Sequence, residues 1–115
     1  MSRKTPSRSH SRRPAHAVLF AALGDKTRLA IVARLCSGQP TSISQLTAGS
    51  RLTRQAVTKH LRVLQRAGLV HNTRSGRESL FALDPEPMQE MQKYLNHVSR
   101  QWDQALARLK SFVEN

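Results

Sequence analysis

The 115-residue sequence predicts a mainly α-helical domain that carries a two-stranded β-hairpin and is dimeric through its terminal helices. Three observations support this fold class. Apolar residues recur at helical spacing over much of the chain. Residues 69–83 instead form two short apolar-bearing runs around a turn that contains glycine. The C-terminal segment, about 86–113, has a heptad pattern of apolar residues. At this length we expect one small domain, residues 14–115.

The composition points to a polyanionic partner. Nineteen Lys and Arg against seven Asp and Glu give a formal net charge of +12, which favours nucleic acid, with an anionic membrane surface as the alternative. No apolar run approaches the roughly 20 residues of a membrane span, and the N-terminus lacks the apolar core of a secretory signal. The one cysteine, Cys36, offers neither an internal disulfide nor a Cys pair for zinc. We therefore expect a cytoplasmic protein with no cofactor and no membrane association.

The N-terminal part begins with a basic segment. Residues 1–13 contain five basic residues, no acid and almost nothing apolar, so we expect a disordered arm. Such an arm either follows DNA phosphates or only adds solubility. A first helix should begin near Pro14 and end before Gly24, with Val18, Leu19 and Phe20 as its apolar body.

The second helix, "KTRLAIVARLCS", should begin after an N-cap at Asp25 and end before Gly38 and Pro40. We expect its apolar face to consist of Leu29, Val32, Leu35 and Cys36. Cys36 closes this face, so a buried structural thiol is the simplest interpretation. A redox switch, with Cys36 pairing across a dimer, is the alternative.

Residues 41–68 predict two short helices joined by "AGSRL". Thr41 or Ser42 caps the first helix, in which Ile43 and Leu46 point inward. Thr53 caps the second, because its hydroxyl can accept from the backbone N–H of Gln55 or Ala56. The second helix has an apolar stripe at i, i+4 and i+7 and ends at a glycine (Val57, Leu61, Leu64; Gly68).

After Gly68 the apolar residues no longer follow helical spacing. The runs 69–73 and 78–83 flank "RSGR" and predict a β-hairpin with a glycine at its tip. After Pro85 and Pro87, one long helix follows, with apolar residues at steps of 3 and 4 (Met88, Met91, Leu95, Val98, Trp102, Ala105, Leu109, Phe112). This a/d pattern predicts a dimer interface formed by Met91, Leu95, Val98, Trp102 and Leu109.

The charges of residues 51–77 separate two functional interpretations. This stretch has seven basic residues and no acid, and Glu78 follows it directly (Arg51, Arg54, Lys59, Arg62, Arg66, Arg74, Arg77). A merely solvated helix face usually mixes both signs, which stabilises it through i,i+4 pairs. With the apolar stripe facing the core, the opposite face carries Arg54, Gln55, Thr58, Lys59 and Arg62. We therefore favour a DNA-binding face over a solvated one.

Two helices with a tight turn, the second one basic, followed by a basic hairpin, make a winged helix-turn-helix. We expect sequence specificity from major-groove contacts of Arg54, Gln55, Thr58 and Lys59. Phosphate or minor-groove contacts should come from Arg62, Arg74 and Arg77. The predicted function is a transcriptional regulator that binds double-stranded DNA, and the alternative is a non-specific nucleoid- or RNA-associated protein. We find no phosphate-binding glycine loop, metal cluster or acid/base pair of an enzyme.

Three segments carry a family resemblance. "TRQAVTKHLRVLQRAGLV" followed by "RSGRESLFAL" is similar to the signature of the ArsR/SmtB-like winged-helix repressors, and "LGDKTRLAIVARL" resembles the second helix of that family. The resemblance covers about residues 15–115. It implies a homodimer that binds a palindromic operator, usually in its own promoter, and dissociates when a signal arrives. The best-known members sense metal ions.

The sequence departs from both metal sites of that family. Where thiolate-site members have a Cys-x-Cys pair, this chain has Ser42 and Ser44, and hydroxyls are poor ligands for soft metals. The site that other members build on their C-terminal helices corresponds to Asp84, Glu86, His97 and Arg100, and a guanidinium cannot ligate a cation. We therefore predict no metal site. An unknown small-molecule or redox effector remains open, with a pocket beside Trp102 as one alternative to a purely apolar role.

Overall fold

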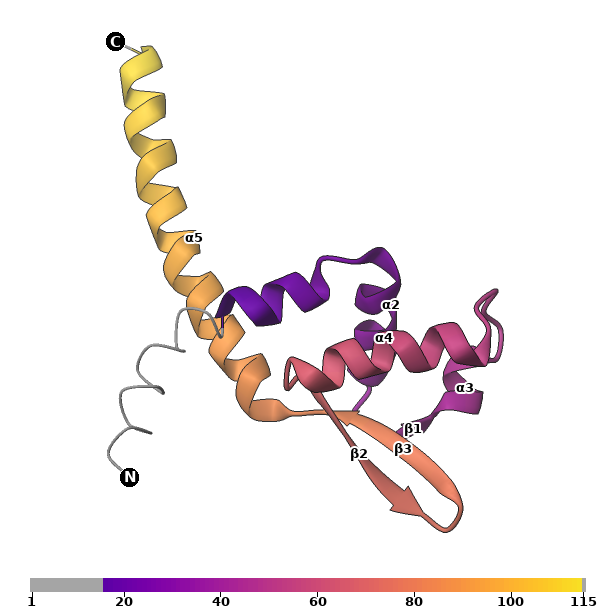
Figure 1. Cartoon of the computed structure of the whole chain (residues 1–115). Helices are drawn as coiled ribbons and strands as arrows, with labels where there is room; N and C mark the ends of the chain where they lie inside the picture. Colours follow the sequence, from indigo (N-terminus) through magenta and orange to yellow (C-terminus); the bar gives the residue numbers. More distant parts are fainter. Residues whose placement is uncertain (1–15, 115) are drawn as a thin grey trace, which may run out of the picture.

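A computed structural model describes residues 16–114 and shows a small helical body from which a hairpin and one long helix project (Figure 1). The basic segment 1–13 and Pro14 lie outside the described residues. The chain is helical over 16–23, and three helices follow: α2 (Lys26–Leu35), α3 (Ile43–Thr47) and α4 (Arg54–Arg66). The hairpin comes next, and α5 (Pro85–Glu114) completes the chain. The predicted fold class, mainly helical with a two-stranded wing, is confirmed.

The wing is formed by β2 (Val70–Ser75) and β3 (Glu78–Leu83), which pair antiparallel with Ser75 opposite Glu78. A two-residue turn of Gly76 and Arg77 joins them, and glycine suits it because the φ angle of Gly76 is +64°. The structure adds a strand that we did not predict. β1 (Thr41–Ser42) pairs with β3 and gives the sheet order β1-β3-β2. Two residues are too short to show any alternation in sequence.

The core lies between the helices and one face of this sheet. Its apolar residues come from each helix and from the wing (Leu19, Ala22, Ile31, Val32, Leu35, Leu46, Val57, Leu61, Leu64, Leu69, Val70, Phe81, Met91). The stripe predicted for α4 is confirmed, since Val57, Leu61 and Leu64 are all buried.

The predicted apolar face of α2 was partly wrong. Ile31, Val32 and Leu35 are buried, whereas Leu29 is exposed. Cys36 is exposed as well, so it is not the buried structural thiol that we expected. At about 100° per residue, Leu29 and Cys36 lie on the flank of the sector that Ile31, Val32 and Leu35 define. Val18 is likewise exposed, although we predicted it in the apolar body of the first helix.

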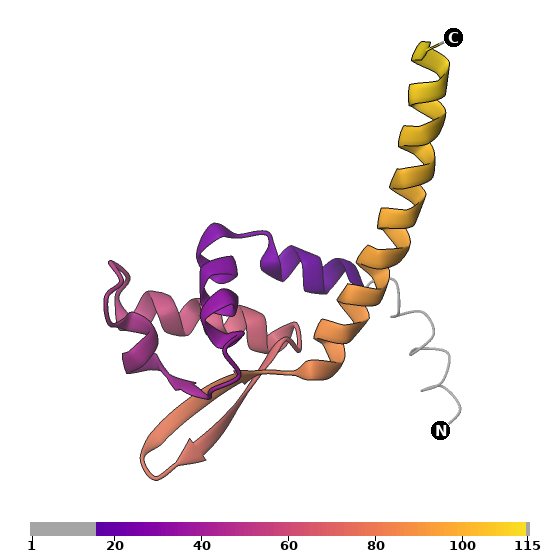
Figure 2. The same ribbon diagram turned by 180° about the vertical axis from the view of Figure 1, so that it is seen from behind.

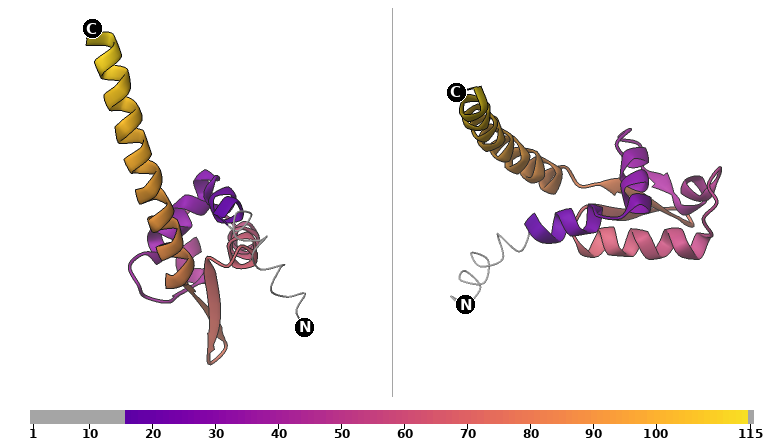
Figure 3. Two further views of the ribbon diagram at one scale, coloured as in Figure 1. Left: turned by 90° about the vertical axis from the view of Figure 1, so that its left-hand side faces the viewer. Right: turned by 90° about the horizontal axis from the view of Figure 1, so that it is seen from above.

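Helix α5 leaves the body soon after it begins (Figure 3). Pro85 and Pro87 stand in its first turn, where the backbone N–H groups have no intrahelical partner, so proline costs little there. Only Met91 of this helix is buried, and it packs in the core of its own chain. Its place in the predicted dimer interface is thereby corrected. Residues 101–114 are all exposed.

The exposed part of α5 is apolar along one side. Tyr94, Leu95, Trp102, Leu106, Leu109, Phe112 and Val113 are large and exposed, with Trp102 at 63%. This helix is long but not apolar all round. No helix within residues 16–114 has the length and hydropathy to cross a membrane.

Candidate nucleic-acid interface

Helix α4 divides into two chemically opposite sides. Val57, Leu61 and Leu64 turn to the core. Four predicted DNA-binding residues of this helix are exposed, and Thr58 is half-buried (Arg54, Gln55, Lys59, Arg62). Because no acidic residue occurs between positions 51 and 77, the outer side carries cationic and neutral polar groups alone. Such a face suits a polyanion.

Both ends of α4 are fixed by local hydrogen bonds. The Thr53 hydroxyl accepts from the backbone N–H of Ala56 at 3.1 Å, which is one of the two N-cap bonds that we predicted. At the other end, Gly68 has a φ angle of +88°. Its N–H donates to the Gln65 carbonyl, and the N–H of Leu69 donates to the Leu64 carbonyl. This Schellman motif ends the helix and directs the chain into the wing.

The wing places two further predicted residues on the surface. Arg74 on β2 and Arg77 in the turn are both exposed. The hairpin projects from the body away from α5, as the view from behind also shows (Figure 2). The amide of Gln65 donates to the side-chain oxygen of Asn72 at 3.1 Å and so joins α4 to β2. This hydrogen bond connects the wing to α4, and both elements carry exposed basic side chains.

Hydrogen bonds stabilise both ends of α3. The Ser42 hydroxyl accepts from the Gln45 N–H, and the Gln45 side chain accepts from the Ser42 N–H, which forms a capping box. At its other end, the Arg34 guanidinium donates to the carbonyls of Gln45 and Leu46. Arg34 was not singled out in the sequence, because its partners lie on another helix and no spacing rule connects them.

A second cross-helix contact fixes α4 against the N-terminal part. Arg28 on α2 donates to the Ala22 carbonyl at 2.6 Å through Nε, and its Nη1 lies 3.3 Å from Nδ1 of His60 on α4. A guanidinium only donates, so in this contact His60 Nδ1 can only accept. Asp25 Oδ2, at the start of α2, lies 3.8 Å from the same nitrogen. His60 thus has a structural role between α2 and α4.

Asp25 itself is the N-cap of α2, as predicted. Its carboxylate accepts from the Arg28 backbone N–H at 3.0 Å, and this hydrogen bond is the main reason why the pKa of Asp25 lies below its usual value. A lowered carboxyl pKa means that the cap stabilises the fold above the unfolded-state pKa. This stabilisation is lost as the pH falls through the lower, folded-state pKa.

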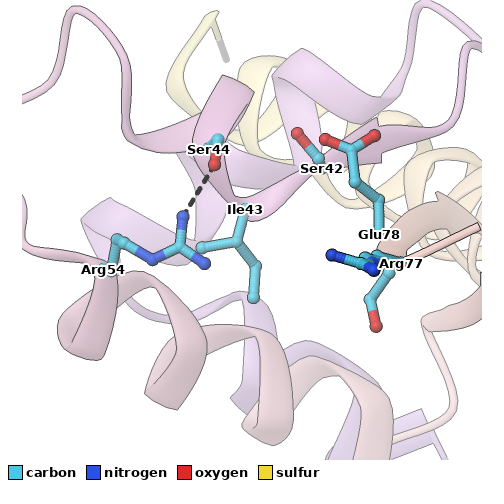
Figure 4. Close-up of a pocket in the computed structure, with 7 residues that line it drawn as sticks. Ser42, Ile43, Ser44, Arg54, Arg77 and Glu78 are labelled. Atoms are coloured by element: carbon cyan, nitrogen blue, oxygen red, sulfur yellow. Dashed lines mark hydrogen bonds between the residues drawn. The ribbon is translucent and has the colours of Figure 1, made fainter.

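Near the start of α4, Arg54 has a defined partner. Its Nη1 donates to the Ser44 hydroxyl on α3 at 2.7 Å. Arg54 and Ser44 line a hollow of about 200 Å³ that Arg77 borders from the wing (Figure 4). Its other lining residues are Ser42, Ile43, Glu78 and Ser79. The structure thus brings Arg54 and Arg77 to the same hollow, although 22 residues separate them in the chain and no sequence pattern connects them.

Thr58 is oriented by its own helix. Its hydroxyl donates to the Arg54 carbonyl one turn earlier, at 2.7 Å. This bond uses the hydroxyl proton within the helix. The methyl group and the hydroxyl lone pairs are the parts of Thr58 that remain for contact with a ligand.

Three of the residues at the two family metal positions have hydrogen-bond partners in the protein. Ser44 accepts from Arg54, and Ser42 is a buried cap. Asp84 Oδ1 lies 2.9 Å from His71 Nδ1 on β2. Within residues 16–114, no three His, Cys, Asp or Glu side chains gather as a metal site would require. The absence of metal sensing stays a prediction.

The sequence left open an effector pocket beside Trp102, but in the single chain the hollow at this residue is hardly enclosed. The hollow there is lined by Gln101, Trp102, Ala105 and Arg108, which all belong to α5. One helix alone cannot enclose a small molecule, because such sites surround most of the ligand surface.

Comparison with known proteins agrees with this arrangement. Residues 23–73 match the model of a helix-turn-helix domain family. The chain is 34% identical over 96 residues to the HTH-type transcriptional regulator Rv2034 of Mycobacterium tuberculosis, covering 84% of this chain and 86% of the relative.

Solved structures show the same likeness. An ArsR-like transcriptional regulator from Rhodococcus sp. RHA1 superposes with a TM-score of 0.70 at 33% identity, over 87% of this chain and 93% of that one. The homodimeric winged helix-turn-helix DNA-binding domain of Mb0332 from Mycobacterium bovis shares the fold, with a TM-score of 0.63 at 18% identity over 86% and 88% of the two chains. The chain therefore belongs to the ArsR-like family of winged-helix, HTH-type transcriptional regulators, which bind DNA and are not enzymes.

Proposed function

We propose that this regulator is a repressor that binds a palindromic operator as a homodimer. The observation that carries the proposal is the two-sided character of α4. The inner side of α4 packs in the core, and its outer side is cationic and adjoins the basic wing. In a winged helix-turn-helix, this second helix enters the major groove. A repressor acts there by occupying promoter DNA, as the resemblance to ArsR/SmtB-like repressors implies.

Dimerisation follows from the exposed apolar side of α5. Monomeric proteins rarely leave a long run of large apolar side chains in water. The stripe continues over residues 101–114, which are all exposed, so no other residue within 16–114 covers it. A second copy supplies the same stripe and closes a two-fold interface. The related domain of Mb0332 is a homodimer, which supports this assembly.

We propose that Gln55, Thr58 and Lys59 read bases. Gln suits adenine bidentately and Lys suits guanine, while the Thr58 methyl group can contact a thymine methyl. Arg62 and Arg74, exposed beside them on α4 and β2, contact phosphate or the minor groove. Two such faces in a dimer read two half-sites about one helical turn apart, which is why the operator should be palindromic.

Gln55→Ala tests this assignment. The variant should lose about 1–3 kcal/mol on the operator and little on a random duplex, because a bidentate base contact exists only on the correct sequence. The operator would first be located by footprinting the DNA upstream of the coding region. Fluorescence anisotropy at one fixed salt concentration then gives both affinities.

Gln65→Ala is a suitable control, since Gln65 lies on the same helix and its amide is bonded to Asn72 of the wing. Equal losses of Gln55→Ala on both duplexes would show that α4 is not the base-reading element. If the unchanged protein binds operator and random DNA equally, the protein is a non-specific nucleic-acid binder and the proposed function fails. A specific regulator should prefer its operator by about 10³-fold or more.

We further expect that DNA binding neither needs a metal ion nor is relieved by one. Both candidate sites lack a complete set of ligands, since Ser42 and Ser44 are hydroxyls and Arg100 repels cations. Adding Zn²⁺ or a chelator should change the operator affinity by no more than a factor of a few. A large release by one metal ion, reversed by chelation, would contradict this and direct attention to Glu86 and His97.

A further inference from the structure

The hollow between α3, the start of α4 and the wing brings together two cationic groups from separate elements. Arg54 is the first residue of α4, and Arg77 stands in the turn of the wing, 23 positions later. In Figure 4 the Arg54 side chain extends from α4 towards Ser44, and the Arg77 guanidinium is directed from the wing towards the same hollow. In this view Ile43 lies between them, and it also lines the hollow. The space amounts to about 200 Å³ and is open to solvent.

The electrostatics of this hollow favour an anion. Among residues 16–114, every ion pair present joins a histidine to a carboxylate, so neither guanidinium is neutralised in this way. Glu78 lines the hollow, but its carboxylate is directed to the Ser42 side, away from Arg54 (Figure 4). The hydrogen bond that the Arg54 guanidinium makes here is to a neutral hydroxyl, which orients the guanidinium without cancelling its charge.

We infer that this hollow holds one phosphate of the DNA backbone between Arg54 and Arg77, and that Ser44 is the positioning residue for Arg54. The inference rests on the proposed function, because it takes the occupant from the duplex that α4 and the wing approach. Arginine suits phosphate through its planar set of donors. The Ser44 bond uses Nη1 and leaves the remaining N–H groups of Arg54 for the anion.

This assignment changes the role of Arg54. From the sequence we expected a base contact in the major groove, because Arg54 belongs to the face of this helix opposite the apolar stripe. The structure directs its guanidinium to Ser44 on α3, at the hollow that Arg77 of the wing also lines. Arg54 and Arg77 then fix the register of the protein on the duplex and carry no sequence information. Base specificity remains with Gln55, Thr58 and Lys59.

The test is a double-mutant cycle on the full chain with operator and random duplexes. Arg54→Ala and Arg77→Ala should each lower the affinity for DNA by about tenfold. The factor should be the same on both duplexes, because the two arginine side chains hydrogen-bond to phosphate, which is common to all DNA. Arg54→Ala/Arg77→Ala should lose less than the product of the two, because both side chains bind the same phosphate. Its salt slope should fall by about one unit rather than two.

Ser44→Ala keeps both charges and isolates the positioning effect. It should weaken binding about two- to tenfold on both duplexes, and it should have no further effect once Arg54 is alanine. Arg66→Ala is the control for charge alone, since Arg66 is exposed on the same helix and lines a different hollow, beside residues 18–22. It should not couple to Arg77→Ala.

Three outcomes would overturn the inference. A loss confined to the operator for Arg54→Ala would make Arg54 a base-reading residue. Multiplicative losses in the cycle would place the two arginines on separate phosphates. Saturable binding of inorganic phosphate by the protein without DNA would make the hollow a receptor for a free anion. All three differ from failure of the proposed function, in which the unchanged protein would not discriminate operator from random DNA.

Discussion

Trp102→Ala should raise the dissociation constant of the dimer by about 10²–10⁴-fold and weaken operator binding with it. Burial of a large apolar side chain contributes roughly 1.5–3 kcal/mol. In a two-fold interface each substitution occurs twice, so the loss per dimer is roughly 3–6 kcal/mol. Trp102 is 63% exposed in the single chain, so its removal should change the fold of one protomer little.

The choice of Trp102 follows from its position along α5. A helix of 30 residues is about 45 Å long at 1.5 Å per residue, and only its first part contacts the body. Leu95 and Leu109 stand seven residues to either side of Trp102 and are 52% and 58% exposed. Removing the central side chain of this stripe therefore opens a gap that its neighbours cannot close.

Sedimentation equilibrium over nanomolar to micromolar concentrations measures the effect on dimerisation, and anisotropy on full and half operators measures the effect on DNA binding. Gln104→Ala is the matched control, since Gln104 is exposed on the opposite side of α5. The half operator should respond little to Trp102→Ala, because a single protomer binds it. A wild-type monomer at micromolar concentration would refute the α5 interface.

How far the sequence predicts this molecule depends on whether the relevant contacts are local. Helix α4 was predicted well, because its cap, its stripe and its terminal glycine all lie within one stretch of chain. The hairpin was predicted for the same reason, since "RSGR" sets the turn and the flanking runs follow from it. Strand β1 was missed because its pairing partner, β3, lies about 40 residues further along the chain.

Helix α2 and Met91 show how a periodic pattern can mislead. In α2 the apolar residues cover more of the circumference than the core can take, so the pattern alone did not exclude Leu29 and Cys36. In α5 one heptad series begins in the core and continues along the exposed part of the helix. Met91 packs in its own chain, whereas Trp102 and Leu109, which continue the same series, are exposed. A sequence pattern identifies an apolar stripe but does not identify what covers each part of it.

The same difference between local and long-range contacts applies to the candidate site. Sequence reasoning identified which residues of α4 and the wing face outward. It did not identify the side chains that hold these elements in place. Arg34 donates to the end of α3, Arg28 meets His60, and Arg54 meets Ser44, each across a separation of ten or more residues. The arginine side chain is long and has several N–H donors. Only the fold therefore decides to which carbonyl or hydroxyl it donates.

Leu61→Ala should lower stability and Arg62→Ala should lower DNA affinity, although the two residues are neighbours in α4. Leu61 is 1% exposed in the middle of the core, so its truncation should lower the free energy of unfolding by about 2–5 kcal/mol. Arg62 is exposed on the outer side, so its truncation should leave the free energy of unfolding within about 0.5 kcal/mol. It should instead lower DNA affinity and reduce the salt slope by about 0.9 if it binds phosphate.

Urea unfolding followed by circular dichroism measures the first effect, at one fixed protein concentration because dimerisation shifts the apparent stability. Anisotropy over a salt series measures the second. Successive residues on a helix are turned by about 100°, so only a helix with one side in the core can separate the two effects so sharply. A strong loss of stability in Arg62→Ala, or an unchanged stability in Leu61→Ala, would mean that α4 is rotated from this orientation. The basic side chains of α4 would then not form the outer, DNA-facing surface on which the proposed function depends.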